Sequence, residues 1–123
     1  MSLRFEIFTA DLDAVVAFYT DVLGFTLVRD ERSAAVGYVA LQRDTVRIGA
    51  AYRPDPVDAA ARRPPTGIEL VLEVDDLHAE HDRVGAAGWP LAEPLQDRPW
   101  GLTDFRVIDP AGHYLRITNR SAA

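Results

Sequence analysis

The chain carries the same short pattern twice, and this repeat limits the folds it can adopt. The segment at 3–12 recurs in outline at 68–77, and Val46-Arg47-Ile48 matches Leu115-Arg116-Ile117 near the end of each copy. A unit of about 60 residues buries too little surface to fold alone. We therefore expect two similar modules that share one core, with a ligand site between or under them.

The first copy, residues 1–52, predicts a strand, a helix and further strands. Apolar and polar residues alternate over 3–8, which is typical of a half-buried strand. An aspartate N-cap and a glycine stop delimit a predicted helix over 11–23. We expect a hairpin of two strands at 36–41 and 45–50.

The second copy, residues 67–120, repeats this order. It predicts a strand at 68–74, a helix over 76–87 and two strands at 105–108 and 114–118, joined by an Asp-Pro-Ala-Gly turn. The repeat thus indicates an α+β fold of two tandem β-α-β-β-β modules.

The whole chain, 1–123, is expected to form one domain. Four prolines within 53–66 predict a linker between the modules. In the second module, 89–95 is a candidate strand and 97–101 a predicted loop.

Composition excludes several kinds of chemistry. The chain has no cysteine, and all 13 basic residues are arginine, so thiolate metal sites, disulfides and lysine Schiff bases are excluded. The net charge of −6 argues against binding to nucleic acid. No apolar run approaches the roughly 18 residues that span a bilayer, and no signal peptide pattern opens the chain, so we expect a cytoplasmic location and no membrane partner.

Two separated motifs resemble a known family. They are Asp11-Leu12 with Phe18-Tyr19 and Leu23-Gly24-Phe25, and Pro99-Trp100-Gly101 followed by Asp109-Pro110-Ala111-Gly112. The chain resembles the vicinal oxygen chelate superfamily, in its glyoxalase/bleomycin resistance protein/dioxygenase branch. The resemblance implies two modules whose sheets curl into a cup with helices outside. It also implies a homodimer with ligand clefts between subunits.

The resemblance also places the family's metal ligands on the inner face of the cup. Residue by residue, these positions fall on Arg4, Arg47, Glu69 and Arg116. Only Glu69 could ligate a metal, because guanidinium groups offer no acceptor. His78 and His81 fall on the second helix, where His81 is expected to be partly buried, and His113 is expected to be exposed in the last turn. We therefore expect no bound metal and no cofactor.

These inner-face charges admit two interpretations. Three arginines around Glu69 could form a structural ion-pair cluster, with Glu69 bonded to Arg4 or Arg116 across the modules. The same groups could instead bind a carboxylate or other oxyanion, because one glutamate neutralises only one guanidinium. Glu6 and Glu73 would balance the local charge, so a network without ligand is also possible.

Trp100 is the strongest candidate for ligand contact. It lies in the polar loop 96–101, where no periodicity explains its burial, and the resemblance places this loop beside the drug cleft of bleomycin-binding proteins. The alternative is a lid over the core. Strand alternation puts Tyr38 and Phe8 on the same cup face. An aromatic ligand stacked on Trp100, with a cationic part against the carboxylates, would suit such a cleft.

Two functions from different classes remain. The first is metal-independent binding or sequestration of a small aromatic or cationic molecule, possibly an antibiotic, in a homodimer cleft. The ligand-binding residues would be Trp100, Tyr38, Phe8, Arg4, Arg47, Glu69 and Arg116. The alternative is a metal-dependent lyase, isomerase or extradiol dioxygenase, or a metal-free catalyst with Glu69 as general base.

Overall fold

The strands form two four-stranded sheets. The computed structural model describes residues 1–35, 37–54, 65 and 67–120. The first sheet has the order β1-β4-β3-β2 and the second the order β5-β8-β7-β6. The strands of the first sheet are β1 (Arg4–Thr9), β2 (Thr26–Glu31), β3 (Tyr38–Arg43) and β4 (Val46–Tyr52). Those of the second are β5 (Leu70–Val74), β6 (Glu93–Asp97), β7 (Thr103–Ile108) and β8 (Tyr114–Asn119).

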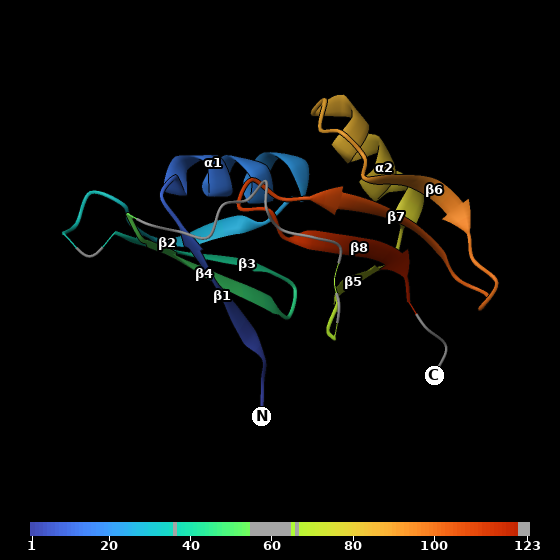
Figure 1. Cartoon of the computed structure of the whole chain (residues 1–123), viewed down its shortest axis with the longest axis horizontal. Helices are drawn as coiled ribbons and strands as arrows, with labels where there is room; N and C mark the ends of the chain where they lie inside the picture. The colour runs from blue at the N-terminus through green and yellow to red at the C-terminus, as the bar shows by residue number, and fades with distance from the viewer. Residues whose placement is uncertain (36, 55–64, 66, 121–123) are drawn as a thin grey trace.

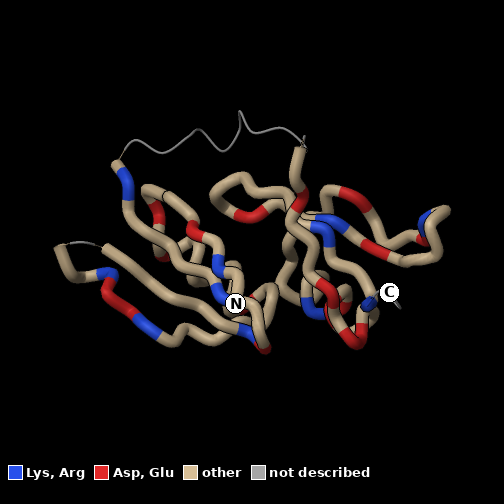
Figure 2. The backbone as a smooth tube through the Cα atoms, turned by 90° about the horizontal axis from the view of Figure 1, so that it is seen from below, with Lys and Arg blue, Asp and Glu red and all other residues tan. Residues whose placement is uncertain are grey.

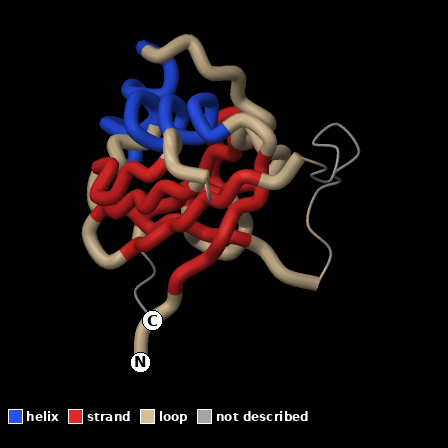
Figure 3. Tube along the Cα trace, turned by 90° about the vertical axis from the view of Figure 1, so that its left-hand side faces the viewer, coloured by secondary structure: helices blue, strands red, loops and turns tan. Residues whose placement is uncertain are grey.

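One side of the sheets is covered by helices. In the first module α1 (Leu12–Ala17) runs on into a π-helical turn, η1 (Phe18–Val22), and the second module has α2 (Leu77–Ala86). The predicted caps are present, because Asp11 and Asp76 each accept a hydrogen bond of 3.0 Å from the backbone three residues on. Figures 1 and 3 show the helices on the same side of the strands. We call the side of each sheet away from the helices its open face.

The α+β fold of two β-α-β-β-β modules is confirmed, although one strand was not predicted and the bounds of several others differ from the predicted ones. β2 has no counterpart among the predicted segments because it is an edge strand whose residues are mostly exposed, so it lacks a clear apolar pattern. The candidate strand at 89–95 lies instead at Glu93–Asp97, where Pro94 and a register shift between Glu93 and Gln96 blur the alternation. The strand predicted at 68–74 begins at Leu70, so Glu69 just precedes it. Val36 and most of the predicted linker, residues 55–64 and 66, lie outside the described residues.

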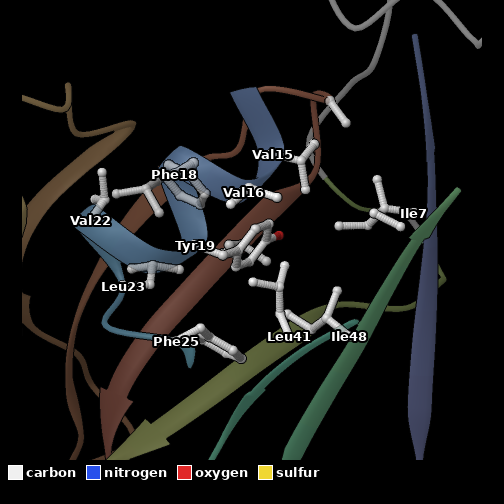
Figure 4. Close-up of a cluster of buried hydrophobic side chains, with 14 of the residues drawn as sticks. Ile7, Val15, Val16, Phe18, Tyr19, Val22, Leu23, Phe25, Leu41 and Ile48 are labelled. Carbon is white, nitrogen blue, oxygen red and sulfur yellow. The ribbon is translucent and has the colours of Figure 1, made fainter. Parts of the chain in front are cut away.

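The two modules share their core. Buried apolar side chains from both sheets and both helices form one cluster, and Figure 4 shows Tyr19 at the centre of its first-module part. Phe18 packs against Trp89 of the second module with ring centroids 4.7 Å apart. Arg43 and Glu80 form a further ion pair between the modules, and Glu80 is buried. Neither module therefore completes its core alone.

A buried carboxylate also joins the modules. Tyr19 donates a hydrogen bond of 2.6 Å to Asp109 Oδ2, and the Nδ1 atom of His113 lies 3.0 Å from the same oxygen. Burial acts to raise the pKa of Asp109, but the hydrogen bonds from His113 and Tyr19 outweigh it, so that pKa is lowered. Burial and the Asp109 charge together raise the pKa of Tyr19 well above its usual value.

The exposure of His113 and His81 depends on the side chains that each ring contacts. The expectation that His113 is exposed is wrong: its side chain is 23% exposed because the ring bonds to Asp109 within the turn. His81 is partly buried as expected and packs edge-on against Phe105, at 5.3 Å between centroids.

Candidate ligand-binding site

The open faces of both sheets carry the candidate residues. Figure 2, viewed from the side opposite the helices, shows acidic and basic positions along the strands of both sheets. Several large apolar side chains are also exposed on this side. By strand alternation they include Phe8, Val71 and Ile108, which are 48%, 37% and 46% exposed. No helix in the described residues is long and apolar enough to cross a membrane.

On the first sheet, small residues separate two aromatic rings. In register, Ala51 of β4 lies between Phe8 of β1 and Tyr38 of β3. The predicted placement of Phe8 and Tyr38 on one face is therefore confirmed. The next row has Gly49 beside Glu6. The centre of this open face is thus lined by small residues, with an aromatic residue on each neighbouring strand.

Because Gly49 has no side chain, the Glu6 carboxylate and the Tyr38 hydroxyl can lie together above it. Tyr38 donates a hydrogen bond of 3.2 Å to Glu6 Oε1. A Cβ atom on Gly49 would lie 2.2 Å from both Glu6 Oε2 and the Tyr38 hydroxyl, so any larger residue would displace them. Partial burial and the Glu6 charge raise the pKa of Tyr38.

The four predicted metal-site positions form separate groups rather than one cluster. Arg4 and Arg47 are neighbours in register, and Arg4 pairs with Glu6 at 2.8 Å. Arg47 forms no ion pair within the described residues. Glu69 pairs with Arg116 at 2.7 Å, inside the second module and not across the modules. Arg47 and Glu69 both line a cavity of about 660 Å³ between the first strands of the two sheets.

On the second sheet, charged side chains form a partly buried network. Arg98 bonds to Asp104 Oδ1 through Nε at 2.9 Å and Nη2 at 2.8 Å, and also to Glu93 at 2.8 Å. Arg106 lies 3.0 Å from Glu93 and 3.6 Å from Asp104 Oδ2. The Asp104 side chain is only 1% exposed, and its Oδ2 atom has no hydrogen-bond partner among the described residues.

Trp100 stands at the edge of this network. It is 55% exposed, so it does not lie buried as a lid over the core would. Its ring centroid lies 5.9 Å from the guanidinium carbon of Arg98 and 6.0 Å from that of Arg116. These distances are in the range of cation–π contact, so two arginines hold the indole while much of it stays accessible.

The residues at the family's metal positions do not fit a divalent metal. Three of the four are arginines, which have no lone pair to donate to a metal. Within the described residues no group of three or more His, Cys, Asp or Glu side chains is arranged to hold an ion.

Sequence reasoning missed four residues of the network: Glu93, Arg98, Asp104 and Arg106. Alternation along β7 was enough to place Asp104 and Arg106 on one face. Only the register shows that Arg106 lies directly opposite Arg116. The position of Glu93 could not be predicted because β6 lies later in the chain than expected and its register shifts between Glu93 and Gln96.

Comparison with known proteins supports the resemblance. The model of the Glyoxalase/Bleomycin resistance protein/Dioxygenase superfamily matches residues 3–117. Among solved structures, TioX from Micromonospora sp. ML1 is similar at 26% identity and TM-score 0.78, covering 98% of this chain and 99% of that chain. A bleomycin resistance determinant encoded on transposon Tn5 is similar at 23% identity and TM-score 0.77, covering 98% of each chain.

A bleomycin-binding protein complexed with bleomycin is similar at 24% identity and TM-score 0.74, covering 98% of this chain and 99% of that chain. No curated protein matches the sequence. The family match spans nearly the whole chain, both modules included. The chain therefore belongs to the Glyoxalase/Bleomycin resistance protein/Dioxygenase superfamily.

Proposed function

We propose that this protein binds a small aromatic molecule on its open faces without a metal, and that Trp100 is the main contact. One observation carries the proposal: a tryptophan that is 55% exposed has the guanidinium groups of Arg98 and Arg116 within 6.0 Å of its ring. A large exposed aromatic ring fixed beside polar groups is typical of ligand sites. The similar structures include a bleomycin-binding protein complexed with bleomycin, which supports binding rather than turnover.

Metal independence rests on the donor set. Arg4, Arg47 and Arg116 replace ligands that a metal-dependent member of the family needs, which leaves Glu69 alone. Glu69 in turn lies 2.7 Å from Arg116. Sequestration needs affinity only, so a site without catalytic groups is sufficient.

We further propose that two copies of the chain form the cleft. The open faces expose apolar side chains, and a second copy would bury them. In such a homodimer Tyr38 and Phe8 of one protomer would face Trp100 of its partner. The first sheet would then supply the apolar wall and the second sheet the charged wall.

The test of the site is a titration of Trp100→Ala with metal-free bleomycin and with 2-naphthoate, followed by calorimetry. We expect the variant to lose at least about tenfold in affinity for whichever probe binds the native protein, about 1.4 kcal/mol. Trp89→Phe is the matched control, because the Trp89 indole bonds to the backbone at Ile108 rather than facing outward. Unchanged affinity in Trp100→Ala, or no binding of either probe, would contradict the proposed site.

The test of the shared cleft is a subunit-mixing experiment. Trp100→Ala and Tyr38→Ala are expected to bind weakly when pure. When the two are mixed and allowed to exchange, a cleft built by both protomers regains binding in the heterodimers. Failure to regain binding, with dimers shown by sedimentation, would place each site within one chain.

A further inference from the structure

We propose that the ligand is an aromatic carboxylate, and that its oxyanion binds between Arg106 and Arg116 beside Trp100. The inference rests on the proposed function and narrows it, since the sequence predicted an aromatic or cationic molecule and left oxyanion binding as one interpretation of the inner-face charges. It depends on contacts that only the folded second sheet brings together.

The two arginines lie directly opposite each other on neighbouring strands. Arg106 of β7 and Arg116 of β8 are partners in register, on the open face. Like charges at directly opposed positions destabilise a sheet unless something neutralises them. Their side chains are only 15% and 25% exposed, so solvent screens this repulsion incompletely.

Each of these arginines has one close acid partner, but the contact lacks hydrogen-bonding geometry. The Nε atom of Arg106 lies 3.0 Å from Glu93, and that of Arg116 lies 2.7 Å from Glu69. Neither Nε atom is aligned for a hydrogen bond, and both are buried without a partner among the described residues. Arg98 takes the well-aligned bonds to Asp104 and Glu93 instead. An oxyanion placed between the two guanidinium groups would accept charge-assisted hydrogen bonds from both and reduce the repulsion between them.

Each arginine also lies beside an aromatic ring. Arg116 lies 6.0 Å from the centroid of Trp100, and Arg106 lies 5.8 Å from that of Tyr114. A carboxylate bound to both arginines would therefore lie near two aromatic rings, and an aryl group attached to it could stack on the exposed indole. This combination selects an acid that carries an aromatic ring.

The corresponding arginines of the first sheet do not form such a site. Arg4 and Arg47 are also neighbours in register, but the Arg4 side chain is 52% exposed and pairs with Glu6. Water screens such a pair well. A cationic ligand placed between Arg106 and Arg116 would be repelled by both guanidinium groups.

The experiment compares three isosteric probes by calorimetry at low salt: 2-naphthoate, neutral 2-naphthamide and cationic 2-(aminomethyl)naphthalene. We expect 2-naphthoate to bind at least about tenfold more tightly than the cation. Arg106→Gln and Arg116→Gln should each lose about tenfold for naphthoate and little for the amide. Arg120→Gln is the matched control, because it removes an exposed arginine just beyond the same strand and should leave all affinities unchanged.

Glu69→Gln gives the sharpest result. It removes the acid that competes for Arg116, so naphthoate should bind several-fold more tightly, whereas a purely structural Glu69–Arg116 pair predicts weaker binding. Arg106→Lys and Arg116→Lys keep the charge but lose the planar fork, so they should weaken naphthoate less than the glutamine variants. These lysine variants replace the glutamine variants in the test if a glutamine variant does not fold.

The outcomes separate the two proposals. If all three probes bind equally and all lose affinity in Trp100→Ala, the binding site stands and the carboxylate inference is wrong. If the amine binds more tightly than the acid, the inference is also wrong. If none of the three probes binds but bleomycin does, with an affinity that falls in Trp100→Ala, only the carboxylate inference is wrong. If neither bleomycin nor any of these probes binds, or if Trp100→Ala changes no affinity, both proposals fail.

Discussion

The two open faces come from the same repeated module, yet they carry different side chains. The face of the first sheet has small residues at its centre, and its Arg4–Glu6 ion pair is partly exposed to solvent. The face of the second sheet carries a network in which Asp104 is buried and Arg98 and Arg106 are nearly so. Repetition fixes the path of the backbone, while the residues on the solvent side of each sheet are free to diverge. We infer that the first face supplies shape and the second supplies charge recognition.

The largest expected effect is a difference in the free energy of unfolding lost when an acid is removed from each face. Asp104→Asn removes a buried charge that Arg98 and Arg106 both face, and we expect it to cost about 3 kcal/mol of unfolding free energy. Glu6→Gln removes a partly exposed acid from the first face and should cost less than about 1 kcal/mol. Urea denaturation of both variants measures the difference. Equal losses would mean that the two faces do not differ in this way.

A matched pair of tyrosine variants compares the core with the open face. Tyr19→Phe removes a donor from buried Asp109 and should cost about 2 kcal/mol. Tyr38→Phe removes the longer bond to Glu6 on the open face and should cost less than about 1 kcal/mol. Thermal and urea unfolding give both values. A larger loss for Tyr38 would contradict the assignment of Tyr19 as the link between the modules.

The stability of the protein at low pH tests the same contact between the modules, the Tyr19–Asp109 hydrogen bond. The pKa of Asp109 is lower in the folded protein than in the unfolded chain, where it is about 3.9. Its contribution is therefore fully present above about pH 4 and is lost as the pH falls through the folded-state pKa. We expect Asp109→Asn to be less stable than the native protein at neutral pH, and the gap to narrow below about pH 4. A gap that stays constant with pH would assign the loss to packing alone.

The smallest expected effect concerns Gly49. A methyl group there collides only with the ends of the Glu6 and Tyr38 side chains, which can move, so Gly49→Ala should change stability by no more than about 1 kcal/mol. It should nevertheless separate the acid from the phenol and lower the pKa of Tyr38 toward its ordinary value. NMR titration of the Tyr38 ring measures this pKa. Glu6→Gln is the control and should lower it too, and an unchanged value in both would show that Glu6 has no influence on the phenol.

Much of the fold could be predicted from the sequence, because the repeat, the aspartate caps and the strand alternation are local signals. The edge strand β2 was not placed because most of its residues are exposed and carry no apolar pattern. Alternation also placed Phe8 and Tyr38 correctly on one face. The pairing of Arg106 with Arg116 could not be predicted, because it depends on strand register, which the sequence does not show. For the same reason Glu69 was assigned to a cluster spanning both modules, whereas it pairs within its own.

The central claim is that ligand binding takes place on the open face at Trp100, and the two tryptophans allow one direct measurement of it. In a nitrogen-15 NMR spectrum of the labelled protein, the indole signals of Trp89 and Trp100 can be assigned with the variants above and followed during titration with 2-naphthoate. The account predicts that the Trp100 signal and the Nε–H signals of Arg106 and Arg116 shift with one common affinity while Trp89, packed against Phe18, stays in place. A shift of Trp89 alone, or none at Trp100, would contradict it.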